Sequence, residues 1–384
     1  NNDRQISVLA NSNNTNTSLF NFGGGGNRGA TSMMRSGMSA MSDMGGMGAA
    51  TTMMQSGGGG SSPAFTGGSN AGISATNSFG FNYRDQWSKR ISVYGSYSYN
   101  HKNTNQLQNS YETNNTTLIN NNQDLNSLTK GNSHRFTFNF EYQIDSFNYL
   151  KVSPSINYSG SDANSQTIFD YKRPDGTKTL DGSNKNLNGS EAPNLAATIL
   201  YNHKFRKRGR NFSSSITLGT SQNNSEQDVT NLSTQYQPFT FSRNTFQFTD
   251  QENNNYSYGV RFTYSEPINK YRSLDFSYSH NLNYGRNDRK TFNVDSATQV
   301  KTLNNFLSND YENNFYNNRI GISLRTTKKK YNYTLGISVQ PVNLQGKSIT
   351  RDSAYKTIKR ANVFPIARLV YNFSRTKTLN ASYN

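Results

Sequence analysis

The chain has 384 residues, of which 32% are hydrophobic and 16% are charged, and its formal net charge is +17. That apolar share is low for a soluble core of this size, while 24 tyrosines and 23 phenylalanines are too many for a disordered chain. No stretch approaches the roughly 18 to 20 consecutive apolar residues of a membrane-spanning helix, which excludes helical insertion. The lack of cysteine excludes a disulfide framework and thiolate metal sites.

Apolar and polar side chains alternate with period two in segments of about ten residues, a pattern typical of β-strands. Weaker alternation at both ends of the chain adds four further candidates, so the sequence predicts about thirteen strands. In chain order the predicted strands are 4–10, 71–83, 91–99, 135–142, 150–158, 195–201, 212–218, 256–264, 274–284, 320–324, 331–339, 361–373 and 379–384.

The connections between these strands alternate between short and long. The short ones are expected near 84–90, 145–148, 205–210, 267–271, 326–330 and 374–378. The long ones are expected near 11–70, 103–131, 161–192, 222–253, 286–313 and 341–360, the first being a Gly- and Met-rich extracellular loop. Long loops at one end of every hairpin are rare in compact soluble domains, whereas outer-membrane barrels have tight periplasmic turns and long extracellular loops.

The two faces of the predicted strands differ in charge. The apolar face of the nine clear strands carries no Asp, Glu, Lys or Arg, and the other face is mostly Ser, Thr, Asn and Gly. A soluble β-sandwich would carry many more Lys and Glu residues on its solvent face. The sequence therefore predicts an antiparallel transmembrane β-barrel with lipid outside and a wet lumen, located in the outer membrane.

The positive charge gathers in the short turns. Fourteen basic residues against two aspartates give these turns +12 of the net +17. Basic groups at that end can meet the phosphates of outer-membrane lipid, although solvated turn residues that merely end the strands would look the same. No basic stripe with stacked aromatics accompanies the charge, so no nucleic-acid partner is expected.

The sequence contains no recognisable catalytic constellation, and no enzymatic activity is expected. His101, His134, His203 and His280 lie in different strands, and no nucleophile elbow, phosphate-binding loop or zinc-protease motif occurs. The eight methionines all fall between residues 33 and 54. Because thioethers favour Cu(I), Met38, Met41 and Met44 are candidate metal ligands, and a low-complexity loop without a ligand is the alternative.

Three short segments carry a resemblance to a known family: 72–78 (GISATNS), 83–87 (YRDQW) and 93–97 (VYGSY). With the strand pattern, they make the chain resemble the outer-membrane β-barrel family of Bacteroidota, which is similar to the barrel part of TonB-dependent receptors. Such receptor barrels have about 22 strands and an N-terminal plug. The resemblance implies uptake of an unknown small solute, energised by a TonB-type complex through a plug that lies outside this chain.

The sequence departs from a whole receptor because it shows no plug, no signal peptide and no terminal strand ending in an aromatic residue. Thirteen strands would also place parallel strands at the closing seam, so we expect a barrel segment that lacks its C-terminal strands. Two other functions stay open at this point. They are a passive or structural barrel, and a secreted Asn- and Gly-rich adhesive or amyloid-like fibre.

Overall fold

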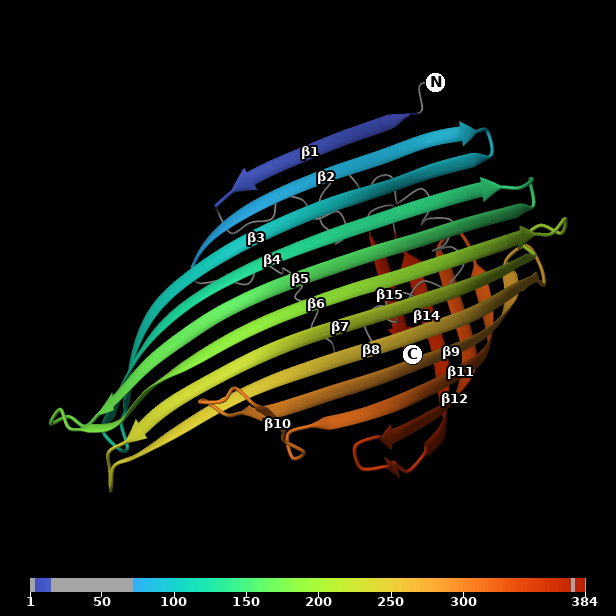
Figure 1. The fold of residues 1–384 in the computed structure, drawn as a ribbon. Helices are drawn as coiled ribbons and strands as arrows, with labels where there is room; N and C mark the ends of the chain where they lie inside the picture. The colour runs from blue at the N-terminus through green and yellow to red at the C-terminus, as the bar shows by residue number, and fades with distance from the viewer. Residues whose placement is uncertain (1–3, 15–71, 374–376, 384) are drawn as a thin grey trace.

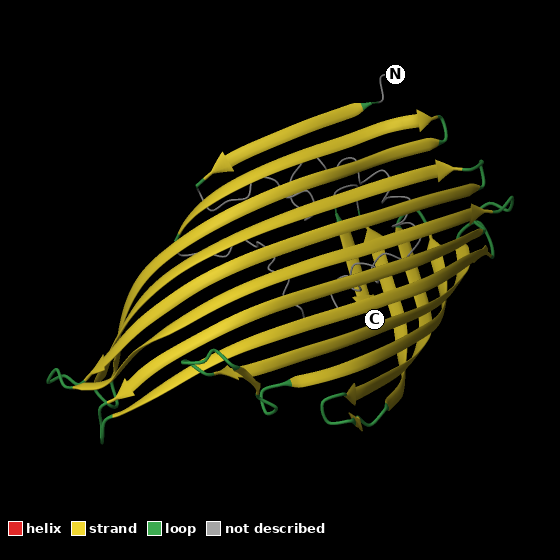
Figure 2. Ribbon diagram, viewed as in Figure 1, coloured by secondary structure: helices red, strands yellow, loops and turns green. Residues whose placement is uncertain are grey.

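In the computed structural model, the described residues are 4–14, 72–373 and 377–383, and their regular structure is entirely β (Figure 2). The sheet holds fifteen strands. They are β1 (Gln5–Asn13), β2 (Ile73–Ser88), β3 (Ile91–Asn114), β4 (Ile119–Gln143), β5 (Asn148–Lys172), β6 (Lys178–Lys204), β7 (Asn211–Gln235), β8 (Phe241–Pro267), β9 (Arg272–Val294), β10 (Lys301–Leu303), β11 (Asn309–Thr327), β12 (Tyr331–Ser348), β13 (Ser353–Ala354), β14 (Ile358–Asn372) and β15 (Thr378–Tyr383).

The strands follow one another in a single antiparallel meander. Thirteen lie on the main path from β1 to β15, while β10 and β13 are short additions beside β9 and β12. The sheet curls, so that β11 to β15 pass behind the middle strands (Figure 1). Because thirteen strands alternate in direction, β1 and β15 run the same way, and no pairing joins them within the described residues. The all-β antiparallel fold and the thirteen main strands are therefore confirmed.

The strands are much longer than the sequence pattern predicts. The strands β3 to β9 have between 23 and 27 residues each. The predicted long loops at 103–131, 161–192, 222–253, 286–313 and 341–360 are wrong, because these stretches are mostly strand and the hairpins close in short tips. In those stretches both faces are polar, so apolar alternation disappears although the backbone ladder continues.

The short connections up to 326–330 are confirmed, and together they form what we call the turn end of the sheet; of the predicted connection 374–378, residues 374–376 lie outside the described residues. Turns lie between β4 and β5, β6 and β7, β8 and β9, and β11 and β12, as predicted, whereas β2 extends through Ser88 and shortens the first turn. Of the predicted loop 11–70, residues 11–13 belong to β1, and almost all the rest lies outside the described residues. We call the opposite end the tip end.

The sheet has its apolar side chains outside and its polar side chains crowded inside. Val93 is the one buried hydrophobic side chain among the described residues, whereas Leu195 is 51% exposed and Ile320 is 60% exposed. Most of the buried polar side chains lie on the other face, including Thr76, Thr291 and Ser338. A soluble sheet buries its apolar face against a second layer, so this arrangement requires an apolar solvent such as lipid.

We call the apolar side of the sheet the outer face and the polar side the lumen face. The outer face is apolar only near the turn end, in what we call the apolar band. The band comprises residues 79–83, 91–99, 134–142, 150–158, 193–201, 212–220, 256–264, 274–284, 316–324, 331–339 and 361–371. Every segment except 79–83 has the roughly 9 to 11 residues that a tilted strand needs to cross a bilayer.

Beyond the band, toward the tip end, the same strands continue as what we call the polar extension. It comprises residues 100–114, 119–133, 159–172, 178–192, 221–235, 241–255, 285–294, 309–315 and 340–348. In β4 it adds fifteen residues, which at about 3.3 Å per residue corresponds to about 50 Å of strand. The sheet is therefore much taller than the band that lipid can cover.

Candidate functional site: the lumen face

The lumen face of the apolar band is lined mainly by small uncharged side chains. Ser96, Asn139, Ser153 and Thr217 are typical of it, and cross-strand hydrogen bonds such as Ser153 Oγ to Asn139 Oδ1, at 2.8 Å, order them. Long side chains are few on this face, so the charged ones project beyond their small neighbours. This is the wall that a solute inside a barrel would touch.

Six basic residues and two carboxylates lie on the lumen face of the band or, for Arg325, one residue beyond it, which gives this surface a charge of 6 − 2 = +4. The basic residues are Arg135, Lys151, Arg261, Arg319, Arg325 and Arg368, and the acidic ones are Glu141 and Asp275. Four of the six basic residues stand on β8, β11 and β14. One wall of the lumen is thus an arginine surface.

Arg261 and Arg319 lie at the same level on this wall. Both pair in register with Ser279 of β9, one from each side. Their backbones are therefore about 10 Å apart, two strand spacings. Arg319 Nε donates to Ser338 Oγ at 2.9 Å, and its guanidinium lies over the Phe364 ring at 5.3 Å. Ser338 and Phe364 hold this guanidinium against the wall, with its charge directed along the lumen surface.

A second arginine pair repeats this spacing nearer the turn end. Arg325 and Arg368 both pair in register with Thr334 of β12. Arg325 Nη2 donates to Asp275 Oδ1 at 3.2 Å, and Ser265 Oγ donates to the same oxygen at 2.6 Å. Asp275 neutralises Arg325, so this pair carries less net charge than Arg261 and Arg319 do.

The opposite part of the band has a compact polar network across β3, β4 and β5. Lys151 Nζ lies 3.0 Å from Glu141 Oε1 and donates to Tyr94 Oη at 2.8 Å. Tyr94 Oη donates in turn to Glu141 Oε1 at 3.0 Å. Lys151 reaches Tyr94 across an intervening strand, a contact favoured on the concave side of a curled sheet. The two charges cancel, so this wall differs from the arginine surface.

The charged residues on the outer face of the polar extension are mainly acidic, whereas those on the lumen face of the band are mainly basic. Twelve of the 23 Asp and Glu residues of the chain lie on it, whereas Glu112 alone lies on the lumen face of the extension. The twelve are Asp124, Asp162, Asp170, Asp181, Glu191, Glu226, Asp228, Asp250, Glu252, Asp288, Asp310 and Glu312. In the extension, the carboxylates thus lie on the outer face and, apart from Glu112, not on the lumen face.

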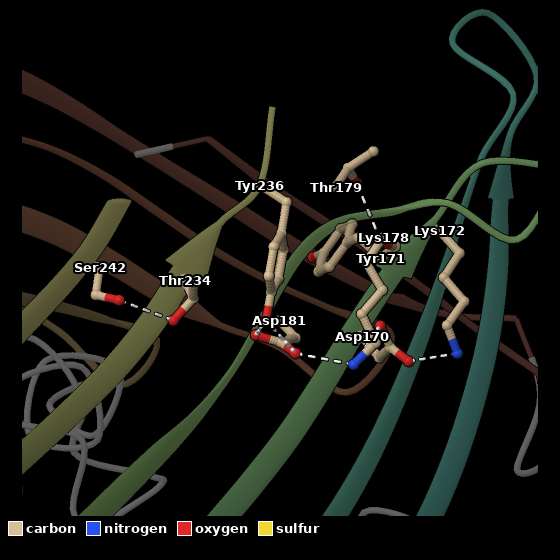
Figure 3. Close-up of polar contacts among 9 residues, drawn as sticks. All are labelled: Asp170, Tyr171, Lys172, Lys178, Thr179, Asp181, Thr234, Tyr236 and Ser242. Carbon is tan, nitrogen blue, oxygen red and sulfur yellow. Dashed lines mark hydrogen bonds and ion pairs between the residues drawn. The ribbon is translucent and has the colours of Figure 1, made fainter. Parts of the chain in front are cut away.

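Figure 3 shows how two of these carboxylates, Asp170 and Asp181, are held near the tips of the β5–β6 and β7–β8 hairpins. Lys178 Nζ lies 2.9 Å from Asp181 and 4.0 Å from Asp170, and Lys172 Nζ lies 2.6 Å from Asp170. Tyr236 Oη donates to Asp181 at 3.2 Å. The hydrogen bond to Asp181 and the charges of both aspartates raise the pKa of Lys178, so the ion pairs hold the tip of the β5–β6 hairpin at neutral pH, and the Tyr236 hydrogen bond joins it to the β7–β8 connection.

The turn end carries the basic residues that the sequence places there. Glu266 accepts from Lys207 Nζ at 2.6 Å and from Arg210 Nε at 2.7 Å, and Tyr264 Oη donates to it at 2.7 Å. These hydrogen bonds, that of Arg210 first, lower the pKa of Glu266 to about 2. Lys328 lies over the rings of Tyr271 and Tyr331. Aromatic rings and basic groups are therefore in contact at this end of the sheet.

The histidines stand apart and sit beside aromatic residues. His134 and His280 lie on the outer face, where Tyr97 Oη is 2.9 Å from His134 Nδ1 and Tyr258 Oη is 2.9 Å from His280 Nε2. Among the described residues no group of three or more His, Asp or Glu side chains could hold a metal ion. The candidate ligands Met38, Met41 and Met44 lie outside the described residues, so the Cu(I) site stays a prediction.

Sequence reasoning missed the lumen arginines as a group. Each of Arg261, Arg319 and Arg325 was visible as a charge on the polar face, but their shared level depends on register, which is fixed by the long strands. Strand register cannot be read when the connecting stretches are taken for loops. The period-two alternation of apolar and polar residues along the strands was the sequence signal from which these arginines could have been identified.

A family model described as the outer membrane protein beta-barrel family matches residues 203–384, the C-terminal part of the chain. The comparison with curated proteins finds no match. Among the described residues, no helix is long and apolar enough to cross a membrane.

Three solved structures are similar at low identity. The translocator domain of the autotransporter NalP from Neisseria meningitidis is 10% identical, with 79% of this chain and 81% of that chain covered and a TM-score of 0.17. The toluene transporter TbuX from Ralstonia pickettii is 12% identical, with 82% and 80% covered and a TM-score of 0.26. The siderophore receptor PiuA from Acinetobacter baumannii is 8% identical, with 80% and 72% covered and a TM-score of 0.24.

The family match and the exposed apolar face of the sheet both indicate an outer-membrane barrel. The matched residues contain β7 to β15, where the outer face of the apolar band is uncharged and the lumen face carries the arginines. An apolar exterior without a second layer is stable in lipid, and an antiparallel meander is the way a chain crosses lipid with strands. The chain is an outer-membrane β-barrel protein.

Proposed function

We propose that this protein takes up a small polar solute across the outer membrane, in the manner of a TonB-dependent receptor. The observation that carries the proposal is the lumen face of the apolar band, where small uncharged side chains leave space and a few ordered charges face it. A barrel with a purely structural role has no need of such a wall. The resemblance of segments 72–78, 83–87 and 93–97 to receptor barrels supports the same function.

The distribution of charge supports an orientation. Arg206, Lys207, Arg208 and Arg210 in one turn, and Lys328–Lys330 in another, place basic groups beside the aromatic edge of the band. Basic side chains at that level bind anionic lipid headgroups. We therefore place the turn end in the periplasm, in contact with outer-membrane lipid, and the polar extension outside the cell.

Uptake against a gradient needs energy, and the barrel wall of this chain has no nucleotide-binding motif. In the proposal the energy comes from a TonB-type complex that acts on a plug inside the lumen. We propose no catalytic role, since the lumen face of the described strands is lined mainly by small uncharged side chains and basic residues.

The proposal is tested by the depletion of solutes from a defined medium. We expect cells that lack this protein to remove at least one small polar solute more slowly than wild-type cells do. The same defect should follow removal of the TonB-type energising complex. Equal depletion of every solute by wild-type and deletion cells would refute uptake, and a defect that ignores the energising complex would indicate a passive barrel.

A further inference from the structure

Part of the lumen face carries no charge and is rich in carboxamides. On the neighbouring strands β7, β8, β9 and β11, sixteen lumen-facing positions at four successive levels include eight asparagines, two aromatic residues and no charged residue. We call these positions the amide patch. They are the odd-numbered residues of 217–223, 253–259, 281–287 and 311–317. Asparagine is a poor strand former, so strand propensity does not account for its accumulation here.

Two carboxamides of the amide patch converge over a glycine. Asn255 of β8 and Asn313 of β11 both pair in register with Gly285 of β9, one from each side. The Oδ1 atom of each lies 2.9 Å from the point that a Cβ of residue 285 would occupy. Glycine leaves that point open, so the two carboxamides face one gap above the backbone of β9.

The carboxamides of Asn255 and Asn313 are exposed, and neither is hydrogen-bonded to another side chain among the described residues. Their neighbours are occupied, since Asn317 Oδ1 accepts from Gln340 Nε2 at 2.9 Å. An asparagine side chain has two N–H donors and an acceptor oxygen, and a hydroxyl group both donates and accepts. A hydroxyl-bearing solute over Gly285 can therefore bond to both carboxamides.

Phe315 gives the gap an apolar side. It follows Asn313 on the lumen face of β11, and it pairs in register with Asn283, the lumen residue beside Gly285. On its other side Phe315 pairs with Leu344, which is 39% exposed. The C–H groups of a sugar ring pack against an aromatic face, while its hydroxyl groups bond to polar side chains at the ring edge. The gap offers both kinds of contact side by side.

We propose that Asn255, Gly285, Asn313 and Phe315 form a subsite for a neutral polyhydroxylated solute of the chemical class of a hexose ring. A charged group placed over Gly285 would lose water without meeting an opposite charge in the amide patch, so a neutral ligand is favoured. The subsite names the class of solute for the proposed function, and its role in transport rests on that function. Binding itself does not.

The subsite is tested by saturation-transfer NMR on the purified full-length protein in lipid vesicles. Maltose, lactose and cellobiose are the probes. Fully O-methylated maltose, which keeps both rings but has no hydroxyl donor, is the control ligand. We expect at least one of the three disaccharides to bind, and O-methylated maltose to give no signal.

The double variant Asn255→Ala and Asn313→Ala should raise the Kd for the bound disaccharide by about tenfold, because the hydrogen bonds of two side chains are lost. Gly285→Ala keeps both carboxamides but fills the gap between them, so it should also weaken binding. Phe315→Leu should weaken binding by about threefold through the loss of the ring, and Phe315→Tyr should bind like wild type.

The matched control is Asn157→Ala. It removes a carboxamide at the same level of the lumen face, on β5 and three strands away from Asn255, and should bind the disaccharide like wild type. A loss in this control equal to the loss in the double variant would show that the amide patch has no special role.

Three further results would overturn the subsite: no binding of any of the three disaccharides to the wild-type protein, equal binding of O-methylated maltose, or wild-type affinity in the double variant. None of these outcomes depends on transport. If solute depletion fails while disaccharide binding is intact and lost in the double variant, the uptake function falls and the subsite stands. Depletion without disaccharide binding would leave the uptake function and remove the subsite.

Discussion

The apolar band and the polar extension are consecutive parts of the same strands, in the same sheet, with the same register. In β4 the band presents Phe136, Phe138 and Phe140 on its outer face, and the extension presents Asn126, Leu128 and Lys130 on that face. Both parts are equally extended backbone. The difference lies in the solvent outside, which is lipid around the band and water around the extension.

The comparison shows that apolar and polar residues alternate only where the two faces of a strand contact different solvents. A strand with water on both faces has no such alternation. The extension is held by its backbone ladder and by side-chain hydrogen bonds such as Asn109 Nδ2 to Asp124 Oδ1, at 2.5 Å. Asn and Asp are poor strand formers by propensity. Pairing between two long neighbours outweighs that preference.

The largest expected effect comes from a charge on the outer face of the band. Phe138→Arg should lower the free energy of unfolding by about 2 to 4 kcal/mol, the cost of a basic residue near the bilayer midplane. The measurement is reversible unfolding of the protein in lipid vesicles.

Two matched controls sharpen this prediction. Leu128→Arg, on the same face of the same strand but in the extension, should stay within about 0.5 kcal/mol of wild type, as exposed substitutions do. Asn139→Arg, on the lumen face, should also cost little. Equal losses for Phe138→Arg and Leu128→Arg would show that lipid does not distinguish the two regions.

The second effect concerns close packing. A Cβ added at Gly336 in the band would lie 2.6 Å from the carbonyl oxygen of Ile322. Gly336→Ala should therefore destabilise the fold by about 1 to 3 kcal/mol through overpacking. In the extension, a Cβ at Gly189 would meet Asp162 Oδ1 at an ordinary 3.6 Å, so Gly189→Ala should be neutral or slightly stabilising in the same unfolding measurement. A larger loss at Gly189 than at Gly336 would contradict the account.

The third effect is an ion pair of the extension. Arg286 Nη2 and Asp310 Oδ2 are 2.7 Å apart, and the Arg286 side chain is 42% exposed. A double-mutant cycle of Arg286→Gln and Asp310→Asn should give a coupling of about 0.2 to 1 kcal/mol that falls with added salt. A coupling that is larger and insensitive to salt would indicate that this part of the sheet is shielded from water.

The smallest effect is a pH dependence at the turn end. The pKa of Glu266 is lowered to about 2, chiefly by the hydrogen bond from Arg210. A carboxyl group with a depressed folded-state pKa stabilises the fold above its ordinary pKa, and this contribution is lost as the pH falls from about 4.5 toward about 2. The free energy of unfolding of Glu266→Gln, titrated over that window, should fall less steeply than that of wild type. Parallel curves would exclude the ion pair as a source of acid sensitivity.

The sequence predicted the band well because lipid and lumen impose different side chains on successive residues. The parity of Phe138 and Asn139 was correct, and Ser153 confirms the lumen position of Asn139. The extension was not predicted, since at Asn126 and Ser127 both faces contact water and no period remains. Arg261 and Arg319 lie at the same level because of the registers of β8 with β9 and of β9 with β11, and no local sequence pattern encodes these registers.

Depth-dependent quenching tests the central claim most directly. Spectroscopic labels are placed one at a time on the outer face of β4, at positions 136, 138 and 140 in the band and at 126 and 128 in the extension, in the full-length protein assembled in vesicles. A lipid-soluble quencher should reach the first three labels and leave the last two unaffected, while a water-soluble quencher should do the reverse. Protection of 136, 138 and 140 from the lipid-soluble quencher would contradict the assignment of this face to the membrane.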